Sequence, residues 1–418
     1  MMWQTSKHAN IRSRIGFFSS FSSFSWANLA LLLAVLLSVL SVSPVALGNS
    51  TLKETISELE ASQQWQQTLK EARGQTVYFY AWGGSKPVND YLRWAAREIA
   101  SRYKVRLRHV KVADISEAVS RLKAEDGSKS AIDLLWINGE NFSYLKAQKL
   151  LLGKLPSAIP NTTLLATEQL SLHNDFGVPM EGYEVPWGVG QFNLIANQSL
   201  FSAKNPEQNS ITPADILSAA ERNPGRISYP RPPEFHGTTF LKQLLVALTD
   251  SDPRLFALAT PNAQQQLLPV LWHYLDKLHP IIWQNGSAFP SSNTEQLALF
   301  TQQQLDLAIS FNPNQMAKEQ SEKRIASNAQ RLFFDGGAIT NSHNLAIPKG
   351  AQSPAGAKVV IHFLLSELAQ KHKVDGSWGD PAVITPLLDP ASTLPAQQEL
   401  HSSWQQVIED TWQQKYGA

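Results

Sequence analysis

Aromatic and amide side chains follow several predicted strands, at positions where a small molecule could be bound. Trp82 ends the apolar run 75–82 and is followed by Gly83 and Gly84. Glycines let a backbone approach a ligand closely, and an aromatic face beside them can stack on a ring or contact a cation. We therefore predict that these three residues contact a ligand. The alternative is that the tryptophan only fills core space.

Polar residues crowd the end of a second apolar run, residues 131–137. Asn138, Glu140 and Asn141 come directly after it, where a helix is predicted to begin. Their side chains could bind the oxygens of a ligand or a cation, or they could simply cap the helix, as Asn does in many proteins. Both roles are compatible, so we include all three as candidate ligand-binding residues.

The other candidates lie in the second half of the predicted fold or next to its connecting loops. Asn312 and Asn314 follow the apolar run 305–311, where amides could bind a ligand. Further aromatic residues near predicted strand ends or connecting loops are Trp136, Trp187, Tyr229 and Trp378. We predict ligand contacts for Trp187 and Tyr229, with core packing as the alternative. The proline-rich segment 229–237 is either a stiff turn or a means of presenting Arg231 or Glu234 to the ligand.

Signatures of catalysis are nearly absent. The chain has no cysteine, which excludes disulfides, thiolate catalysis and thiolate-bound metals. Residues 143–146 match S-x-x-K, but the companion motifs S-D-N and K-T-G are missing. Residues 188–190 read Gly-Val-Gly and do not continue as a dinucleotide-binding fingerprint. The histidines are scattered. We therefore predict no catalytic residues, no metal site and no cofactor.

The composition favours a protein with a small-molecule partner. Thirty-six basic residues balance 35 acidic ones, and this balance gives no electrostatic footprint for nucleic acid. Its 418 residues, 43% of them hydrophobic, can form one or two sizeable cores. We expect a monomer that does not bind nucleic acid.

The first 48 residues have the pattern of an export signal. Basic residues precede the uncharged apolar run 27–42, and the small residues Ala46 and Gly48 follow it. This order is typical of a cleavable signal peptide. The run is short for a membrane-spanning helix, which needs about 20 apolar residues. We expect cleavage after Gly48 and a periplasmic protein, with a retained membrane anchor as the alternative.

Strands and helices alternate after a predicted helix at residues 49–72. Strands are predicted at 75–82, 105–112 and 131–137, each followed by a helix, and Asp114 with Glu117 is predicted to form a capping box. Such alternation implies a parallel sheet, whose ligands bind beyond the carboxyl ends of its strands. Further elements are predicted downstream: strands at 191–196, 226–229, 305–311 and 343–348, and helices at 237–248 and 355–370.

Four segments resemble the family-1 extracellular solute-binding proteins, which include thiamine, spermidine, ferric-iron and maltose receptors. They are VYFYAWGG, AIDLLWINGENF, VPWGVGQFNLIAN and SHNLAIPKGAQSPAGAKVVIHFLLS, and the resemblance covers roughly residues 75–385. Within the family the chain looks most similar to the YnjB-type branch, which is related to the thiamine-binding group.

The resemblance implies an α/β fold with two lobes and a ligand cleft between them. Each lobe would be a mostly parallel sheet flanked by helices. Strands near 185–190 and 338–344 would cross between the lobes. The implied boundaries are 73–187 plus 342–385 for lobe one, and 190–340 plus 386–418 for lobe two.

The implied function is that of a periplasmic receptor for an ABC importer. It would deliver a small polar or cationic organic solute (thiamine-like, a polyamine or a sugar) to an ABC permease. The second half lacks the adjacent tyrosine pair of the iron receptors, which argues against iron. A periplasmic enzyme on a similar scaffold and a membrane-anchored interaction protein remain as alternatives.

Overall fold

The computed structural model describes residues 49–112, 114–201, 209–389 and 393–417. The chain divides into one compact unit that ends at Glu60 and a second unit, residues 61–418, that contains both major sheets. The predicted signal peptide, residues 1–48, lies outside the described residues. No described helix is both long and apolar enough to cross a membrane. The helix predicted before the first strand is α2 (Asn49–Ala72).

The first three strands form the predicted parallel arrangement. β1 (Thr76–Trp82) pairs in parallel with β2 (Arg106–Val112) on one side and with β3 (Leu134–Ile137) on the other. The helices that follow these strands are α3 (Lys86–Tyr103), α4 (Ser116–Glu125) and α5 (Gly139–Ala147). The predicted β-α-β-α-β-α order is therefore confirmed.

The start of α4 differs from the prediction. The helix begins at Ser116, and its N-cap position is held by Ile115. Asp114 instead accepts a hydrogen bond from the amide of Ser116, at 2.8 Å. Because Asp114 lies one residue too early, the predicted capping box with Glu117 does not form.

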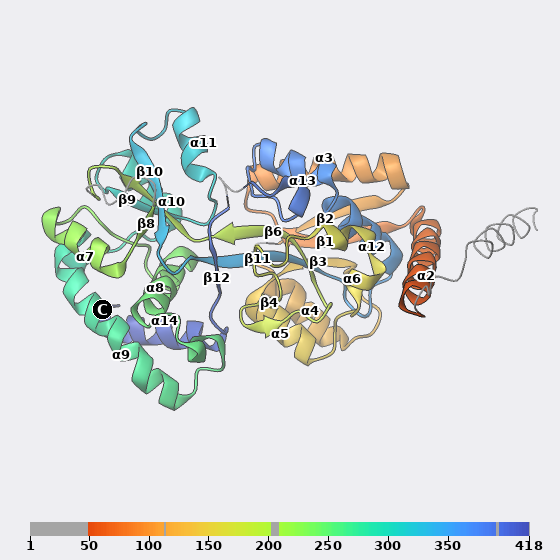
Figure 1. The fold of residues 1–418 in the computed structure, drawn as a ribbon, viewed down its shortest axis with the longest axis horizontal. Coiled ribbons are helices and arrows are strands. Elements are labelled where there is room, and N and C mark those ends of the chain that lie inside the picture. The colour runs from red at the N-terminus through yellow and green to blue at the C-terminus, as the bar shows by residue number, and fades with distance from the viewer. Residues whose placement is uncertain (1–48, 113, 202–208, 390–392, 418) are drawn as a thin grey trace, which may run out of the picture. The chain divides into compact units, whose positions relative to one another are not determined.

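Six strands make up the first sheet, in the order β12-β11-β3-β1-β2, with β6 paired to β11. The additional strands are β6 (Val185–Gln191), β11 (Ala338–Ala346) and β12 (Ala396–Gln398). Helices α3, α12 (Pro354–Leu364) and α13 (Glu367–Asp375) lie on one side of this sheet, and α4 and α5 on the other (Figure 1). A separate apolar cluster fills each side.

The second sheet has the order β8-β10-β7-β9. Its strands are β8 (Ser210–Ile211), β10 (Ala329–Phe334), β7 (Asn193–Asn197) and β9 (Leu307–Ser310). Only β8 and β10 are parallel, whereas β10–β7 and β7–β9 are antiparallel. The expectation of a mostly parallel sheet is therefore wrong for this half, because β6 enters β7 directly, without a helical crossover.

The helices of the second half pack mainly around the second sheet. They are α7 (Pro213–Arg222), α8 (Phe235–Leu248), α9 (Pro261–Leu278), α10 (Asn293–Thr301), α11 (Gln315–Ser321) and α14 (Ser403–Tyr416). Trp404 and Trp412 of α14 are fully buried in the core of this half. Shorter elements elsewhere are α6 (Leu155–Ala158), β4 (Asn174–Asp175) and β5 (Val178–Pro179).

Two further predictions need correction. Residues 226–229 do not form a strand, because the side chain of Gln296 bridges the carbonyl of Ser228 and the amide of Ile309. The predicted helix 355–370 is two helices, α12 and α13. The break lies at Ser366, whose hydroxyl caps the amide of Ala369.

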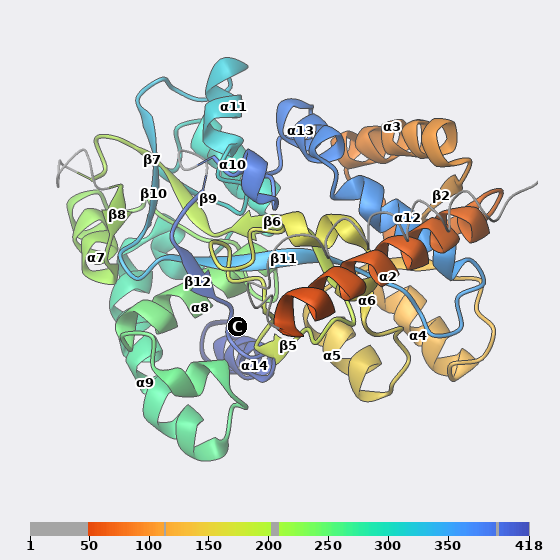
Figure 2. The same ribbon diagram turned by 45° about the vertical axis from the view of Figure 1, so that its right-hand side comes forward.

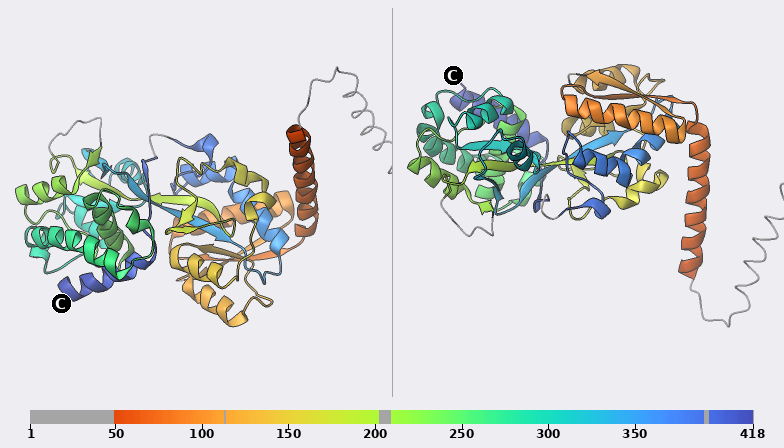
Figure 3. Two further views of the ribbon diagram at one scale, coloured as in Figure 1. Left: turned by 60° about the horizontal axis from the view of Figure 1, so that its bottom comes forward. Right: turned by 90° about the horizontal axis from the view of Figure 1, so that it is seen from above.

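Two strands connect the sheets, near the predicted crossings. β6 leads into β7, β10 leads into β11, and β6 pairs with β11 in antiparallel orientation (Figure 2). Val189 and Leu345 on these strands belong to the core of the first sheet, whereas Ile339 belongs to the core of the second. Both views in Figure 3 show the two strands passing between the sheets.

Candidate functional site

One face of the crossing strands carries two glycines and two polar side chains. Gly188 and Gly190 of β6 lie opposite His343 and Asn341 of β11. Residues directly opposite in an antiparallel pair project to the same face. We call these four residues the glycine face. It lies on the same side of the first sheet as α3 and α13.

A buried ion pair lies directly on Gly188. Lys373 is fully buried and donates hydrogen bonds to Asp380 and to the carbonyl of Trp187, both at 3.0 Å. A Cβ atom on residue 188 would lie 2.9 Å from a carboxylate oxygen of Asp380. Glycine is therefore required for this ion pair to approach the strand. Burial lowers the pKa of Lys373, and the charge of Asp380 opposes this effect.

Aromatic rings surround the glycine face on both sides. Phe311, which follows β9, lies so close that a Cβ on Gly190 would be 3.2 Å from its ring. The ring of Phe235, at the start of α8, lies 4.6 Å from that of Phe311 between centroids, and Phe235 is 41% exposed. From the first sheet, the ring of Trp136 lies 5.3 Å from that of His343. The two sheets thus present aromatic rings to one hinge region.

The segment that carries Asp380 also contacts the second half of the chain. Asn312 and Asn314 both donate hydrogen bonds to the carbonyl of Gly379, at 3.1 Å each. Lys318 donates to the carbonyl of Ser377. These three bonds link the loop after β9 and α11 to the loop after α13.

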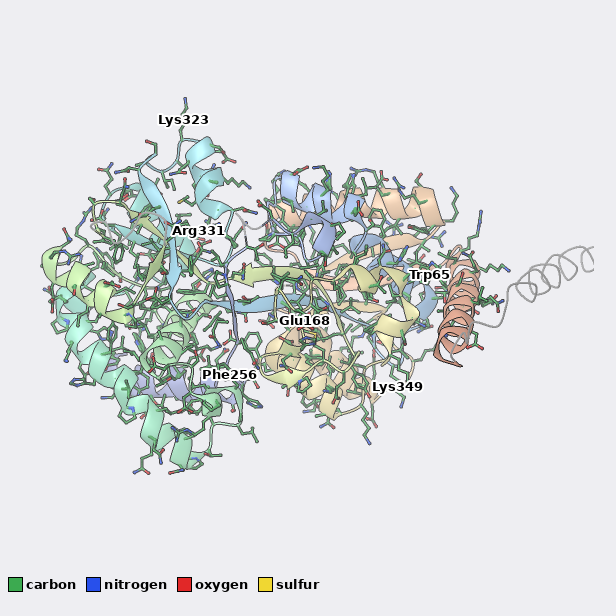
Figure 4. All side chains as sticks on the ribbon, viewed as in Figure 1. Trp65, Glu168, Phe256, Lys323, Arg331 and Lys349 are labelled. Atoms are coloured by element: carbon green, nitrogen blue, oxygen red, sulfur yellow. The ribbon has the colours of Figure 1, made fainter. Side chains whose placement is uncertain are left out.

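A cavity of about 580 Å³ lies beside this link. It is bordered by Asn314 and Lys318 from one side and by the segment 374–379 from the other. An adjoining cavity of about 480 Å³ contains Arg331 of β10, which is labelled in Figure 4. Both volumes fall within the range typical of small-molecule sites.

The opposite face of the crossing strands is acidic. Asn344 lies opposite Ile137, whose side chain packs on the α4–α5 side of the first sheet. Asn344 also makes a hydrogen bond to Asp175, which lies close enough to Glu184 and Glu399 for their charges to interact. We call Asn344 and these three carboxyl groups the acid face. All four residues are at least 97% buried.

Burial changes the ionisation of this acid face. It raises the pKa of Asp175 to about 8, against hydrogen bonds from the Gly139 amide and from Asn344. It also raises the pKa of Glu184 well above its usual value, and the charge of Asp175 adds to this shift. Asp175 is therefore mostly protonated at pH 7. Glu399 lies 3.5 Å from the buried ammonium group of Lys242.

Unpartnered buried polar atoms are concentrated at these two faces. Among the described residues, both amide atoms of Asn341 lack a hydrogen-bond partner, as does Oδ1 of Asn344. The same holds for both carboxyl oxygens of Glu184 and for one oxygen each of Asp175 and Glu399. Buried polar groups in folded proteins are nearly always paired. Of these atoms, the two of Asn341 lie on the glycine face, and the others lie on the acid face.

The two predicted loops of the first sheet lie at the same edge. β1 and β3 are parallel and in register, so that the residues after Trp82 and after Ile137 lie at one end of the sheet. Trp82 is 47% exposed, and its ring covers Gly84 so closely that a Cβ there would lie 2.5 Å from it. Gly83 accepts a hydrogen bond from Asn89 through its carbonyl. Contact of Trp82, Gly83 and Gly84 with a solute stays a prediction.

The start of α5 is capped differently from the expectation. Asn138 occupies the N-cap position but makes no side-chain capping bond. The amide of Gly139 donates instead to Asp175, at 2.6 Å. Glu140 is exposed and Asn141 is partly exposed. The side chain of Asn138 therefore has no capping role, and ligand contacts by Asn138, Glu140 and Asn141 stay predictions.

Trp187 and Tyr229 lie in two different cores and not in a common site. Trp187 is fully buried next to Phe79 and Trp136. Tyr229 is 1% exposed, and its hydroxyl is hydrogen-bonded to His279 and Trp412. Both side chains pack in these cores, and Nε1 of Trp187 has no hydrogen-bond partner among the described residues. Ligand contacts by Trp187 and Tyr229 stay predictions. The side-chain amides of Asn312 and Asn314 both donate hydrogen bonds to the carbonyl of Gly379.

Sequence reasoning missed Asn341, His343 and Asp380. The Gly-Val-Gly run at 188–190 was the available signal, since alternate glycines in a strand leave one face open to close packing. Among the described residues, no three histidine or acidic side chains are grouped so that they could hold a metal ion.

Comparison with known proteins identifies the family. The sequence profile described as bacterial extracellular solute-binding protein matches residues 94–392. The chain belongs to this family. It is 39% identical over 371 residues to protein YnjB of Escherichia coli K12, covering 84% of this chain and 94% of YnjB. The predicted family and branch are confirmed.

Solved structures show the same fold at low sequence identity. The periplasmic binding protein AfuA of Actinobacillus pleuropneumoniae, with fructose-6-phosphate bound, matches with a TM-score of 0.56 and 15% identity, covering 82% of this chain and 99% of AfuA. Iron-bound HitA of Pseudomonas aeruginosa matches with a TM-score of 0.56 and 15% identity, covering 80% and 98%. The two-lobed periplasmic-binding-protein fold is confirmed. Membership of this family implies an exported protein with a small-molecule ligand and an ABC permease as its partner.

Proposed function

We propose that this chain is the solute receptor of an ABC importer and that its solute binds beside the crossing strands β6 and β11. The observation that carries the proposal is the buried side-chain amide of Asn341 on β11, neither of whose polar atoms has a hydrogen-bond partner in the described part of the chain. Buried polar groups without a partner destabilise a folded protein by about 1–3 kcal/mol each, so such an amide indicates a place that a ligand completes.

Contacts from both halves of the chain meet at this place. Phe311 and Asn312 come from the loop after β9, whereas Gly379 and Asp380 come from the loop after α13. A solute that touches both lobes stabilises the closed form through its differential contacts. The permease would then recognise that form. The proposed lobe boundaries are 187–190 and 340–342, and the two main apolar cores support this proposal.

The proposed solute is a small polar or cationic organic molecule. Exposed Trp82 and Phe235 supply aromatic faces, and Glu140 and Glu234 supply carboxylates at the ends of α5 and α8. AfuA and HitA hold fructose-6-phosphate and iron on the same fold, so the fold alone does not select the solute. We further propose export with cleavage after Gly48, a monomeric periplasmic protein, and no catalysis, metal site, cofactor or nucleic-acid binding.

A thermal-shift screen of metabolites with the exported protein tests this function. A compound at about 100 times its dissociation constant should add roughly 2.7 kcal/mol to the free energy of unfolding. The same compound should reduce the radius of gyration in solution scattering, because it closes the lobes. Conversion of a stabilising compound into a product would instead support an enzyme. Absence of any stabilising compound in a broad periplasmic metabolite set would contradict the receptor function.

A further inference from the structure

Asn341 is the only residue of the glycine face whose side chain is a buried amide without partners in the described part of the chain. It is 3% exposed, and neither Nδ2 nor Oδ1 has a hydrogen-bond partner there. A buried amide left in this state destabilises the solute-free protein. An apolar residue of similar size would avoid that cost, so the presence of an asparagine at position 341 indicates a role beyond packing.

A second buried asparagine at the same hinge provides the contrast. Asn193, at the start of β7, is fully buried and donates to the carbonyls of Gln191 and Ser310, at 2.8 and 3.1 Å. Its Nδ2 joins β7 to β9 and so has a structural role, whereas its Oδ1 has no partner in the described part of the chain. Asn341 makes no such connection, although it lies on the neighbouring crossing strand.

The surroundings of Asn341 indicate what it could bind. It lies opposite Gly190, where Phe311 packs, and it shares the face of β11 with His343, next to Trp136. One ring therefore packs on the residue across from Asn341, and another packs on His343, two residues along the same face. Aromatic rings stack favourably on other flat rings. The nearby carboxylate of Asp380 is already paired with Lys373, so this face offers no uncompensated charge.

We propose that Asn341 binds the solute through both atoms of its amide, and that the solute carries a flat ring with a hydrogen-bond donor and an acceptor on neighbouring positions. An amide presents one acceptor and two N–H donors, which matches such an edge. This inference rests on the proposed function, because it assumes that the solute binds beside the crossing strands. In this role, Asn341 determines which solutes the protein binds.

Two leucine substitutions separate a binding role from a structural one. Without solute, Asn341→Leu should melt at the same temperature as the parent protein or higher, because it removes an unpaired buried amide. Asn193→Leu is the matched control and should melt several degrees lower, because it breaks two hydrogen bonds. A drop for Asn341→Leu as large as that for Asn193→Leu would overturn the inference.

Binding is then measured with two flat-ring compounds, cytosine and 2-aminopyridine, in which an amino donor is next to a ring-nitrogen acceptor, and with putrescine and glucose, which have no such ring. We expect cytosine or 2-aminopyridine to bind the parent protein, and Asn341→Leu to weaken that binding about tenfold or more. Failure of both ring compounds to bind, or equal binding by the variant, would overturn the inference. If putrescine or glucose bound both proteins equally, the receptor function would stand while the role of Asn341 would fall.

Discussion

The two faces of the crossing strands accommodate buried charge in different ways. On the glycine face, the carboxyl group of Asp380 is paired with the buried amino group of Lys373, at 3.0 Å. On the acid face, Asp175 has no such cation, and burial raises its pKa to about 8. The contrast is therefore between Asp380, which has a cationic partner, and Asp175, which binds a proton, whereas Glu399 of the acid face lies near Lys242. Asn341 and Asn344 of β11 face opposite sides because residues along a strand alternate between the two sides of a sheet.

Removing the buried ammonium group of Lys373 should lower the free energy of unfolding by the largest amount. Lys373→Met leaves the buried carboxyl group of Asp380 with only the distant ring of His343, at 4.0 Å, and loss of a buried charge partner typically costs about 3–5 kcal/mol. It would also remove a hydrogen bond to the carbonyl of Trp187. The free energy of unfolding from denaturant titration should fall by an amount in this range.

The double variant Lys373→Met/Asp380→Leu is the control for that experiment. It removes both charges, so it should be clearly more stable than Lys373→Met alone. If the double variant were no more stable than the single one, the loss would come from packing, and the glycine face would not depend on the ion pair.

The raised pKa of Asp175 on the acid face should make the stability of the protein depend on pH. A carboxyl group with a raised pKa stabilises the fold fully below its unfolded value, near 3.9. That contribution declines as the pH rises and is lost once the pH passes about 8. Between these values the decline amounts to about 1.4 kcal/mol per pH unit. Asp175→Asn cannot ionise, so its stability relative to the parent protein should increase from pH 6 to pH 8.

Asp252, a partly exposed acid, provides the comparison. Pairing with Arg254 lowers the pKa of Asp252 to about 2, so Asp252→Asn should change stability by a constant amount between pH 6 and pH 8. If the stability of Asp175→Asn and of the parent protein changed with pH in the same way, Asp175 would be ionised throughout this range. The acid face would then carry a charge, as the glycine face does.

The fold could be predicted from the sequence where local patterns of residues determine it. The first sheet follows from apolar runs alternating with amphipathic helices, because such periodicity directly reflects two covered faces. Residues 226–229 were misread because a side chain, that of Gln296, replaces a strand pairing. No local pattern encodes such a long-range contact.

The site was predicted only in part, for a related reason. The positions of Trp82 and Asn138 at one sheet edge follow from parallel strand order, which the sequence does encode. The pairing of Asn341 with Gly190 depends on the register of two strands about 150 residues apart in the chain. The burial of Trp187 likewise depends on Phe79 and Trp136, and a single tryptophan carries no sign of which way it faces.

The smallest effect on stability is expected for substitution of Trp82. This substitution also tests whether the solute contacts the α4–α5 side of the first sheet. Trp82 alternates with the core residues Phe79 and Ala81 and is 47% exposed. Trp82→Ala should therefore change stability by less than about 1 kcal/mol, whereas Trp187→Ala should cost about 3–5 kcal/mol. If a ring or cation stacks on Trp82, the substitution should weaken solute binding roughly ten- to hundredfold, measured by calorimetry. Unchanged affinity would confine the solute to the glycine face, and a large drop in melting temperature would place Trp82 in the core.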